Sequence, residues 1–288
     1  MPPRRRFTIP LPRGGSLALG DRTLIMGVIN VTPDSFSDGG CLFDPAQAIE
    51  AGLRMAEEGA DLIDVGGEAT RPGAEPLGEG EECRRVLPVV EGLVARVRIP
   101  VSIDTYKAST AAAALEAGAS LVNDISGLRY EPALAEVVAR RGVPIVLMHT
   151  RGRSRQMYEQ ASYHDVIAEV LDELRESMAF ATTAGIAAES IILDPGLGFA
   201  KDAARSYEAL ARLDEFAEIG RPLLVGPSRK SFLARSLGGA LPPRDRDWAT
   251  AAAVAFAALA GAHIVRVHAV REMLQVVRVA DEIRRYHS

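Results

Sequence analysis

The stretch that decides the fold is Leu24-Ile-Met-Gly-Val-Ile-Asn-Val-Thr-Pro-Asp-Ser-Phe-Ser-Asp-Gly-Gly40. Its first part is almost entirely apolar, as expected for a parallel strand that is buried on both faces. Polar side chains crowd the chain from Asn30 onward, and Pro33 cannot continue a ladder, so the strand should end near Asn30. A buried strand that ends in oxygen and amide groups is typical of the catalytic edge of an α/β fold. A long turn rich in Asn, Asp and Ser is the alternative.

Short apolar runs alternate with helical stretches along the rest of the chain. The eight runs cover residues 24–29, 62–65, 101–103, 121–122, 145–148, 191–193, 223–225 and 264–267. The eight helical stretches cover residues 46–58, 79–97, 108–117, 132–140, 165–184, 207–218, 248–259 and 270–285. This alternation predicts an α/β fold, a (β/α)8 TIM barrel, with a doubly wound open sheet as the alternative. We expect a single domain over residues 1–288, with an extended lead-in at 1–23 and a hairpin through 16–19.

The amino-acid composition favours a soluble globular protein and argues against several classes of function. Hydrophobic residues make up 48% of the 288 residues and charged residues 25%, as in soluble globular proteins. The net charge of -5 gives no electrostatic case for binding nucleic acid or an anionic membrane. Cys41 and Cys83 are too few for a disulfide framework or a zinc site, which suits a reducing cytoplasm. The start lacks the apolar stretch of a secretory signal, and the alanine-rich run 249–265 is broken by Gly261 and His263, so we expect no membrane span.

Polar side chains follow every apolar run at the point where the strand should end. The carboxyl ends of barrel strands meet on one face, where barrel enzymes gather their active sites. The sequence therefore predicts an enzyme rather than a scaffold. The polar groups are Asn30, Asp64, Asp104, Asn123 with Asp124, His149 after Met148, Asp194, the loop Gly226-Pro-Ser-Arg-Lys-Ser231, and Arg266 with His268.

Two of these places suit an anion. The loop from Gly226 enters a helix with free backbone N–H groups and carries two cations, Arg229 and Lys230. Arg266 and His268 are two apart on one strand and should point the same way. Arginine with a second donor suits phosphate or pyrophosphate. The alternatives are a surface ion pair for Arg266 and a structural imidazole for His268.

Asp104, Asn123 and Asp194 would form a polar pocket that accepts N–H donors from a flat heterocycle. Buried carboxylates need such donors or a nearby cation to stay ionised, and Lys230 could supply the cation. Asn30 and neighbouring carboxylates could hold Mg²⁺ together with a pyrophosphate, because Mg²⁺ prefers oxygen ligands shared with substrate. A zinc hydrolase is disfavoured because the histidines form no close pair, and no dinucleotide loop or P-loop is present. The long segments 30–40 and 66–80 are typical of lids.

Taken together, these motifs resemble the dihydropteroate synthase family of folate biosynthesis. The resemblance covers the whole barrel in order. Ala69, where many members have Ser, is a mild variation. The matching segments are the Asn30–Gly40 segment, Gly66-Gly-Glu-Ala-Thr-Arg-Pro-Gly73, Asp104, Asn123-Asp124, Asp194-Pro-Gly-Leu-Gly-Phe199, Ser228-Arg-Lys-Ser231 and Arg266-Val-His268.

The resemblance implies a transferase that condenses 6-hydroxymethyl-7,8-dihydropterin pyrophosphate with p-aminobenzoate, giving dihydropteroate and pyrophosphate. It implies catalytic roles for Lys230, Asp104, Asp194, Arg266 and His268. The implied pterin site is Asp104, Asn123, Met148, Asp194, Gly226 and Lys230. The implied aminobenzoate site is Phe36, Asp38, Thr70, Arg71, Pro72, Phe199, Ser228 and Ser231. A sulfonamide drug that resembles p-aminobenzoate would bind the same site. Asn30, Arg266 and His268 would hold the pyrophosphate, with Asn30 as a ligand of Mg²⁺.

The resemblance also implies a homodimer, for which the helices at 248–259 and 270–285 are candidate interfaces. Two other functions stay in competition. A pterin-binding methyltransferase with a corrinoid partner would have no evident use for both the Thr70-Arg-Pro72 and the Ser228-Arg-Lys-Ser231 segments. A barrel that binds pterin without turnover is disfavoured because the polar groups at the strand ends are intact.

Overall fold

The computed structural model describes residues 4–32, 44–70, 73–153, 157–159, 161–239 and 241–286. Within these residues, eight parallel strands form one sheet in the order β8-β7-β6-β5-β4-β3-β10-β9. The strands are β3 (Leu24–Asn30), β4 (Leu62–Gly66), β5 (Val101–Asp104), β6 (Leu121–Asp124), β7 (Ile145–Met148), β8 (Ile191–Asp194), β9 (Leu224–Val225) and β10 (Ile264–Val267).

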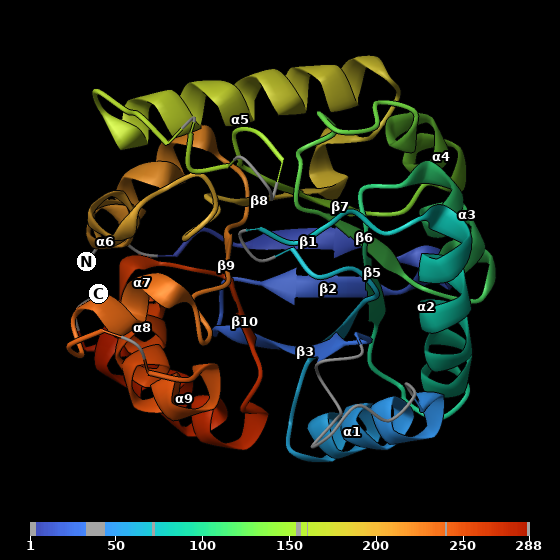
Figure 1. Cartoon of the computed structure of the whole chain (residues 1–288), viewed down its shortest axis with the longest axis horizontal. Coiled ribbons are helices and arrows are strands. Elements are labelled where there is room, and N and C mark those ends of the chain that lie inside the picture. Colours follow the sequence, from blue (N-terminus) through green and yellow to red (C-terminus); the bar gives the residue numbers. More distant parts are fainter. Residues whose placement is uncertain are drawn as a thin grey trace.

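The sheet curls so that its two ends meet. The Leu193 N–H donates to the Pro222 carbonyl at 2.9 Å, and a parallel bridge joins Leu193 to Leu223. The helices enclose the strands on the outside (Figure 1). The predicted (β/α)8 barrel is therefore confirmed, and the open doubly wound sheet is wrong. No helix within the described residues has both the length and the apolar character needed to cross a membrane.

Nine α-helices lie in the described part of the chain, and most match the predicted stretches. Asp44 caps α1 by accepting from the Ala46 N–H, and Asp165 caps α5 by accepting from the Ile167 N–H. Left-handed glycines, Gly142 among them, end several helices. The helices are α1 (Pro45–Glu57), α2 (Glu79–Val94), α3 (Ala108–Glu116), α4 (Leu134–Arg141), α5 (Val166–Thr183), α6 (Ala203–Ala211), α7 (Ser231–Arg235), α8 (Asp247–Ala260) and α9 (Val270–Arg285).

Two helical elements differ from the sequence prediction. The single helix predicted at 207–218 is α6 followed by the 3-10 helix Leu213–Ile219, and α6 begins earlier because Asp202 caps it by accepting from the Arg205 N–H. The short helix α7 was not predicted as a separate element, because five residues are too few to show a helical period.

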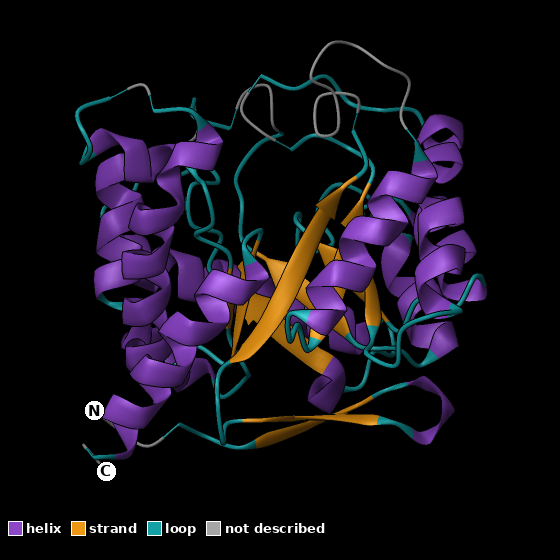
Figure 2. Ribbon diagram, turned by 90° about the horizontal axis from the view of Figure 1, so that it is seen from below, coloured by secondary structure: helices purple, strands orange, loops and turns teal. Residues whose placement is uncertain are grey.

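The lead-in forms the predicted hairpin, which closes the amino end of the barrel. β1 (Phe7–Pro10) pairs antiparallel with β2 (Ser16–Leu19), and Figure 2 shows this hairpin lying across one end of the barrel. Its residues Ile9, Leu17 and Leu19 are buried against the residues that fill the barrel at that end. A 3-10 turn, Pro12–Gly14, connects its strands, and two further 3-10 turns lie at Ala188–Ser190 and Pro243–Arg246. The other end of the barrel is left for the polar residues.

Candidate functional site

The polar residues predicted from the strand ends do lie at the carboxyl end of the barrel. Asn30, Asp104 and Asp194 are the last residues of β3, β5 and β8. The register places Asp104 beside Asn123 and places Met148 beside Asp194. Residues far apart in the chain thus meet on one face, as the barrel prediction required.

Arg266 lies at the centre of a buried charge cluster. Its Nε donates to Asp64 Oδ2 at 2.7 Å and its Nη2 to Asp104 Oδ2 at 2.6 Å. The Asn123 amide also donates to Asp64 Oδ2, at 2.8 Å. Because Asp64 is fully buried and the Arg266 side chain is only 20% exposed, the alternative of a surface ion pair for Arg266 is wrong. Asp64 was recognised as a polar group at a strand end, but the sequence analysis gave it no role in the site.

Burial makes Asp104 a weak acid. Burial is the main influence that raises the pKa of the Asp104 carboxyl to about 7; Arg266 opposes the rise, and the negative charge of Asp64 adds to it. Gly66 leaves the space that Asp104 occupies, because a Cβ on Gly66 would lie 3.3 Å from the Asp104 Cβ and Oδ2 atoms. The carboxyl group therefore titrates near neutral pH, which is common at catalytic sites.

Lys230 and Asp194 form a second buried group of charges. Lys230 Nζ donates to the Leu197 carbonyl and lies 3.9 Å from the centre of the Phe199 ring. Burial lowers the pKa of Lys230 to about 7, and the Asp194 charge opposes this shift. Burial raises the pKa of Asp194, and Lys230 is the largest opposing influence. The predicted cation is thus present beside Asp194, although Asp104 pairs with Arg266 instead.

Several polar atoms at this end have no hydrogen-bond partner among the described residues. They are Asp104 Oδ1, the side-chain oxygen Oδ1 of Asn123 and Asp194 Oδ2; the other side-chain atom of each group makes a hydrogen bond. Met148 belongs to an apolar cluster with Tyr106 and Ile125, against which Phe199 packs. Acceptors beside one ammonium group and an apolar wall suit a flat heterocycle with N–H donors.

His268 is held between Ser228 and Asn30. Its Nδ1 lies 2.8 Å from Ser228 Oγ, and its Nε2 lies 3.3 Å from the Asn30 amide nitrogen. Burial and the nearby Arg229 guanidinium lower the pKa of His268 to about 3, so the imidazole is neutral at physiological pH. The Asn30 amide can donate only if Nε2 accepts, so Nδ1 then carries the proton and donates to Ser228.

One of the two cations predicted at the seventh loop does not face the site. Arg229, whose backbone is left-handed with φ 59°, pairs with Asp247 through both of that residue's carboxylate oxygens at 2.7 and 2.8 Å. Its backbone N–H donates to Thr250 Oγ1. Arg229 therefore ties the loop to α8, and Lys230 is the cation left in the site. Gly226 lies beside Arg266, where a Cβ would approach the Arg266 Cβ to 3.7 Å.

The Mg²⁺ prediction rests on Asn30. The described residues contain no group of three or more His, Cys, Asp or Glu side chains that could hold a metal. The Asn30 amide nitrogen faces His268, and the side-chain oxygen Oδ1 of Asn30 has no hydrogen-bond partner among the described residues. One protein oxygen fits an ion carried mainly by substrate phosphates and water, as Mg²⁺ often is.

Comparison with known proteins identifies the family. The pterin-binding enzyme family matches residues 26–268. A dihydropteroate synthase from Synechocystis sp. is 45% identical over 278 residues, which is 96% of each chain. Dihydropteroate synthase from Xanthomonas albilineans, solved with 4-aminobenzoic acid, has a TM-score of 0.88 and 43% identity over 96% of this chain and 98% of that one. The same enzyme solved with 7,8-dihydropteroate has a TM-score of 0.82 and 41% identity, covering 91% and 94% of the chains.

The chain belongs to the dihydropteroate synthase family. The resemblance seen in the sequence and the prediction of a transferase are therefore confirmed. Among the residues that this family resemblance singled out, Phe36, Asp38, Arg71 and Pro72 lie outside the described residues. Thr70 is partly exposed after β4, and Ser231 is exposed at the start of α7.

Two buried lysines next to this dihydropteroate synthase site were missed by the sequence analysis. Lys107 pairs with Glu68 and Glu82, and Lys201 contacts His149. Each follows the end of a predicted strand in the sequence: Lys107 comes after Asp104 of β5, and Lys201 comes after Asp194 of β8. The short distance in sequence from a strand end was the only signal for these lysines, because the partners of a buried lysine depend on tertiary packing.

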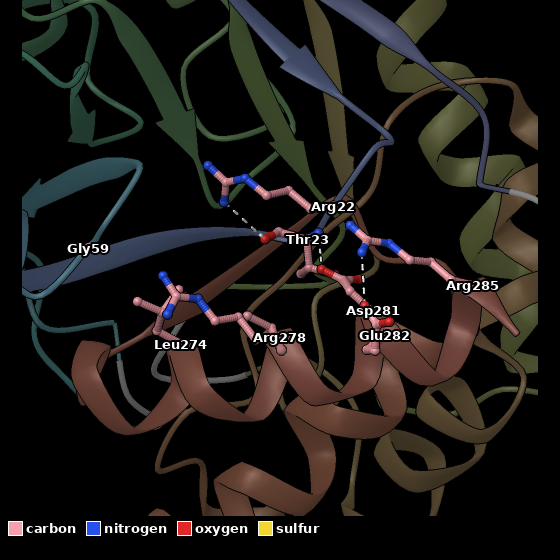
Figure 3. Close-up of a pocket in the computed structure, with 9 residues that line it drawn as sticks. Arg22, Thr23, Gly59, Leu274, Arg278, Asp281, Glu282 and Arg285 are labelled. Atoms are coloured by element: carbon pink, nitrogen blue, oxygen red, sulfur yellow. Dashed lines mark hydrogen bonds and ion pairs between the residues drawn. The ribbon is translucent and has the colours of Figure 1, made fainter.

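A surface pocket at the opposite end of the barrel is not part of this site (Figure 3). It is lined by residues of the lead-in and of α9, among them Thr23 and Asp281. Its charges are mostly paired already: Asp281 accepts from Thr23 N at 2.6 Å and from Arg4 at 3.0 Å, and Arg285 pairs with Glu282. The pocket therefore marks where α9 is fastened to the lead-in.

Proposed function

We propose that the chain condenses 6-hydroxymethyl-7,8-dihydropterin pyrophosphate with p-aminobenzoate, giving 7,8-dihydropteroate and pyrophosphate. The observation that carries the proposal is the set of unpartnered acceptors on Asp104, Asn123 and Asp194 beside the Lys230 ammonium group. A pterin ring offers N–H donors along one edge and a carbonyl oxygen that can accept from Lys230, so its hydrogen-bonding pattern complements this set.

The leaving group would depart toward Arg266 and Asn30. Arg266 Nε and Nη2 are used by Asp64 and Asp104, whereas Nη1 has no partner among the described residues and can donate to a phosphoryl oxygen. The Asn30 side-chain oxygen Oδ1 would hold Mg²⁺. When bound, this ion would neutralise charge on the departing pyrophosphate. His268 positions Asn30 through Nε2; donation from the same nitrogen to pyrophosphate would require the other tautomer.

The bond changes need no covalent intermediate with the protein. The bond between the pterin methylene carbon and the pyrophosphate oxygen breaks, and its electron pair leaves with pyrophosphate. The amine nitrogen of p-aminobenzoate forms the new bond to the methylene carbon and loses one proton. The electron-rich pterin stabilises positive charge at the methylene, and Asp104 and Asp194 stabilise it further from the pterin edge.

The aminobenzoate would lie on the other side of Lys230. Two contacts support this: the Lys230 ammonium group lies against the Phe199 ring, and Ser228 hydrogen-bonds to His268. Thr70 and Ser231, with Phe36, Asp38, Arg71 and Pro72, would complete the subsite. A sulfonamide that mimics p-aminobenzoate should compete for it.

Detection of 7,8-dihydropteroate by chromatography tests the proposal. The product should form only when both substrates and Mg²⁺ are present. Chelation of Mg²⁺ should abolish it, and readdition should restore it. Failure to form product with a well-folded protein, under conditions where an authentic dihydropteroate synthase is active, would overturn the proposal.

We further propose that the chain acts as a single barrel domain in a cytoplasmic homodimer. α8 and α9 pack together and expose large apolar side chains that a partner could cover. Trp248 of α8 is 89% exposed, and Tyr286, which directly follows α9, is 86% exposed. Phe256 of α8 and Ile283 of α9 are further exposed apolar side chains. Light scattering that shows only monomer at micromolar concentration would contradict the dimer.

A further inference from the structure

Lys201 is a buried cation that the proposed reaction does not use. It follows β8 by a short turn and is only 1% exposed. Its Nζ lies 2.8 Å from His149 Nδ1, 3.2 Å from the Gly196 carbonyl and 3.2 Å from the Phe199 carbonyl. None of these partners is a carboxylate, so the burial of this charge needs another reason.

The composition of the chain makes the position unusual. Of the 33 lysine and arginine residues, only Lys107, Lys201 and Lys230 are lysines. All three lie at the carboxyl end of the barrel, and each places its ammonium group against buried partners. An ammonium group donates in three tetrahedral directions, whereas a guanidinium group is planar. The three acceptors around Lys201 match the ammonium group.

Glu173 sets the tautomer of His149, and His149 in turn presents an acceptor to Lys201. Glu173 Oε2 lies 3.1 Å from His149 Nε2, and the pKa of Glu173 is held far below its usual range although burial opposes this, because His149, Arg151 and Arg129 donate to it. An ionised carboxylate requires a proton on Nε2, so in the neutral ring Nδ1 is an acceptor. Lys201 must then donate to Nδ1 as well as to the two carbonyls, which uses all three ammonium protons.

The two carbonyls belong to a turn with an unusual backbone. Gly196, Gly198 and Ala200 are all left-handed, with φ of 69°, 76° and 47°. Gly196 packs so closely on β7 that a Cβ would lie 2.0 Å from the His149 carbonyl oxygen. A left-handed alanine is strained and persists only where its surroundings hold it. The Lys201 ammonium group donates to the Gly196 and Phe199 carbonyls and so stabilises this conformation of the turn.

The same turn carries the groups that face the substrates. Asp194 Oδ1 accepts from the Gly196 N–H at 2.7 Å, and the Leu197 carbonyl accepts from Lys230. The Phe199 ring lies against the Lys230 ammonium group. The charge of Lys201 also acts on Asp194, where it opposes the rise in pKa that burial causes.

We propose that Lys201 is a positioning residue for the reaction: its buried ammonium group holds the turn 194–200 in the shape that presents Asp194 and Phe199 to Lys230. Lys201 touches no substrate and acts through this turn. The inference rests on the proposed pterin site. Burial lowers the pKa of Lys201 to about 7, and the negative charges of Asp194 and Glu173 oppose this shift. His149, oriented by Glu173, supplies the third acceptor for the ammonium group.

The test compares Lys201→Met with the wild-type protein by calorimetric titration with 6-hydroxymethylpterin, and by steady-state kinetics. Methionine preserves length and burial but removes the donors. We expect the Kd for the pterin to rise at least tenfold and kcat/KM to fall by a similar factor. Asp281→Asn is the control for lost stability, because it removes buried hydrogen bonds at the other end of the barrel; its pterin Kd should match that of the wild type.

A merely structural role would not couple Lys201 to Lys230. If both act through one turn, the double variant Lys201→Met/Lys230→Ala should lose less pterin affinity than the product of the two single losses. Losses that multiply, or a Lys201→Met variant that binds and turns over within twofold of the wild type, would overturn the proposal. A wild-type protein that neither binds the pterin nor forms product would instead overturn the proposed function.

Glu173→Gln is a second test, which does not depend on whether Lys201→Met folds. It removes the charge that places the proton on His149 Nε2, so Lys201 loses its third acceptor in part of the molecules. Pterin Kd should rise about threefold, a change smaller than that for Lys201→Met. Glu169→Gln is the matched control, because Glu169 pairs with Arg151 as Glu173 does but does not contact His149. Equal pterin affinity in the two variants would overturn the proposal.

Discussion

Arg266 shows how single residues at this site combine charge and position. It holds two carboxylates at once, and one of them, Asp64, has a buried Oδ1 atom with no partner in the described part of the chain. Separating a buried pair leaves an uncompensated charge, which is far more unfavourable than losing a surface pair. Arg266 therefore maintains the shape of the site before it meets any phosphate.

Lys230→Ala should reduce catalysis more than folding. The variant removes the ammonium group beside Asp194 and Phe199, so kcat/KM should fall by an amount equivalent to about 2–4 kcal/mol of transition-state stabilisation. Steady-state kinetics measure the effect, and circular dichroism checks that the fold is retained. Near-normal turnover would remove Lys230 from the mechanism.

The pH dependence of kcat/KM should be bell-shaped with both limbs near neutrality. Burial raises the pKa of Asp104 to about 7, so this carboxyl is protonated and loses acceptor capacity as pH falls below that value. Burial lowers the pKa of Lys230 to about 7, so its charge is lost as pH rises above that value. Because the groups interact, the two limbs report the cluster rather than single residues. A profile that is flat from about pH 6 to about pH 9 would contradict this.

At the scale of elements, Glu68 and Lys107 anchor the loop between β4 and α2. Lys107 pairs with Glu68 of this loop and with Glu82 of α2. Glu68 also accepts from the Leu77 N–H at 3.0 Å and from the Tyr106 hydroxyl. The anchor thus joins both arms of the loop to the end of β5.

Lys107→Met should destabilise the fold strongly. It leaves Glu68 and Glu82 buried without their cation, and burial already raises the pKa of Glu82. The free energy of unfolding in urea should fall by about 3–5 kcal/mol. Arg84→Met is the control: its ion pair with Glu81 is exposed, and no measurable change is expected. Equal stability of the two variants would contradict the anchor.

The strands and most helices could be predicted because their signals are local. A strand buried on both faces reads as a continuous apolar run, and Asp44 with Pro45 marks the start of α1 in the sequence itself. α7 and the division of the predicted helix at 207–218 were missed, because five-residue and 3-10 helices have no readable period.

At the scale of the whole molecule, the two ends of the barrel have different roles: the amino end contributes stability and the carboxyl end contributes the site. The amino end is closed by the hairpin and by the fastening of α9, in which Asp281 accepts from Thr23 and Arg4. The carboxyl end carries the charges whose pKa values burial has shifted. This division is general for TIM barrels, where loops at the carboxyl end supply chemistry and the rest supplies stability.

Asp281→Asn should therefore lower stability without changing catalysis. Asparagine cannot accept all three hydrogen bonds that Asp281 accepts from Thr23 and Arg4. The free energy of unfolding should fall by on the order of 3 kcal/mol, while kcat/KM per folded molecule stays at the wild-type value. A fall in kcat/KM would show that the amino end contributes to catalysis.

The residues at the strand ends could be predicted from the sequence, whereas the contacts that hold them in place could not. Residues at strand ends, such as Asp104, Asn123 and Asp194, could be found because the barrel topology dictates where they meet. Asp64 and Lys201 could not be assigned, because a buried charge is explained only by its partners in three dimensions. The outward turn of Arg229 toward Asp247 is a tertiary contact of the same kind.

The most direct test of the proposed reaction is pyrophosphate release from dihydropterin pyrophosphate and Mg²⁺, measured with and without p-aminobenzoate. We predict release that depends on p-aminobenzoate, with one dihydropteroate formed for each pyrophosphate. Tight pterin binding without p-aminobenzoate-dependent release would contradict it. The barrel and its pterin pocket would survive that result, but the chemistry assigned to Lys230, Arg266 and Asn30 would not.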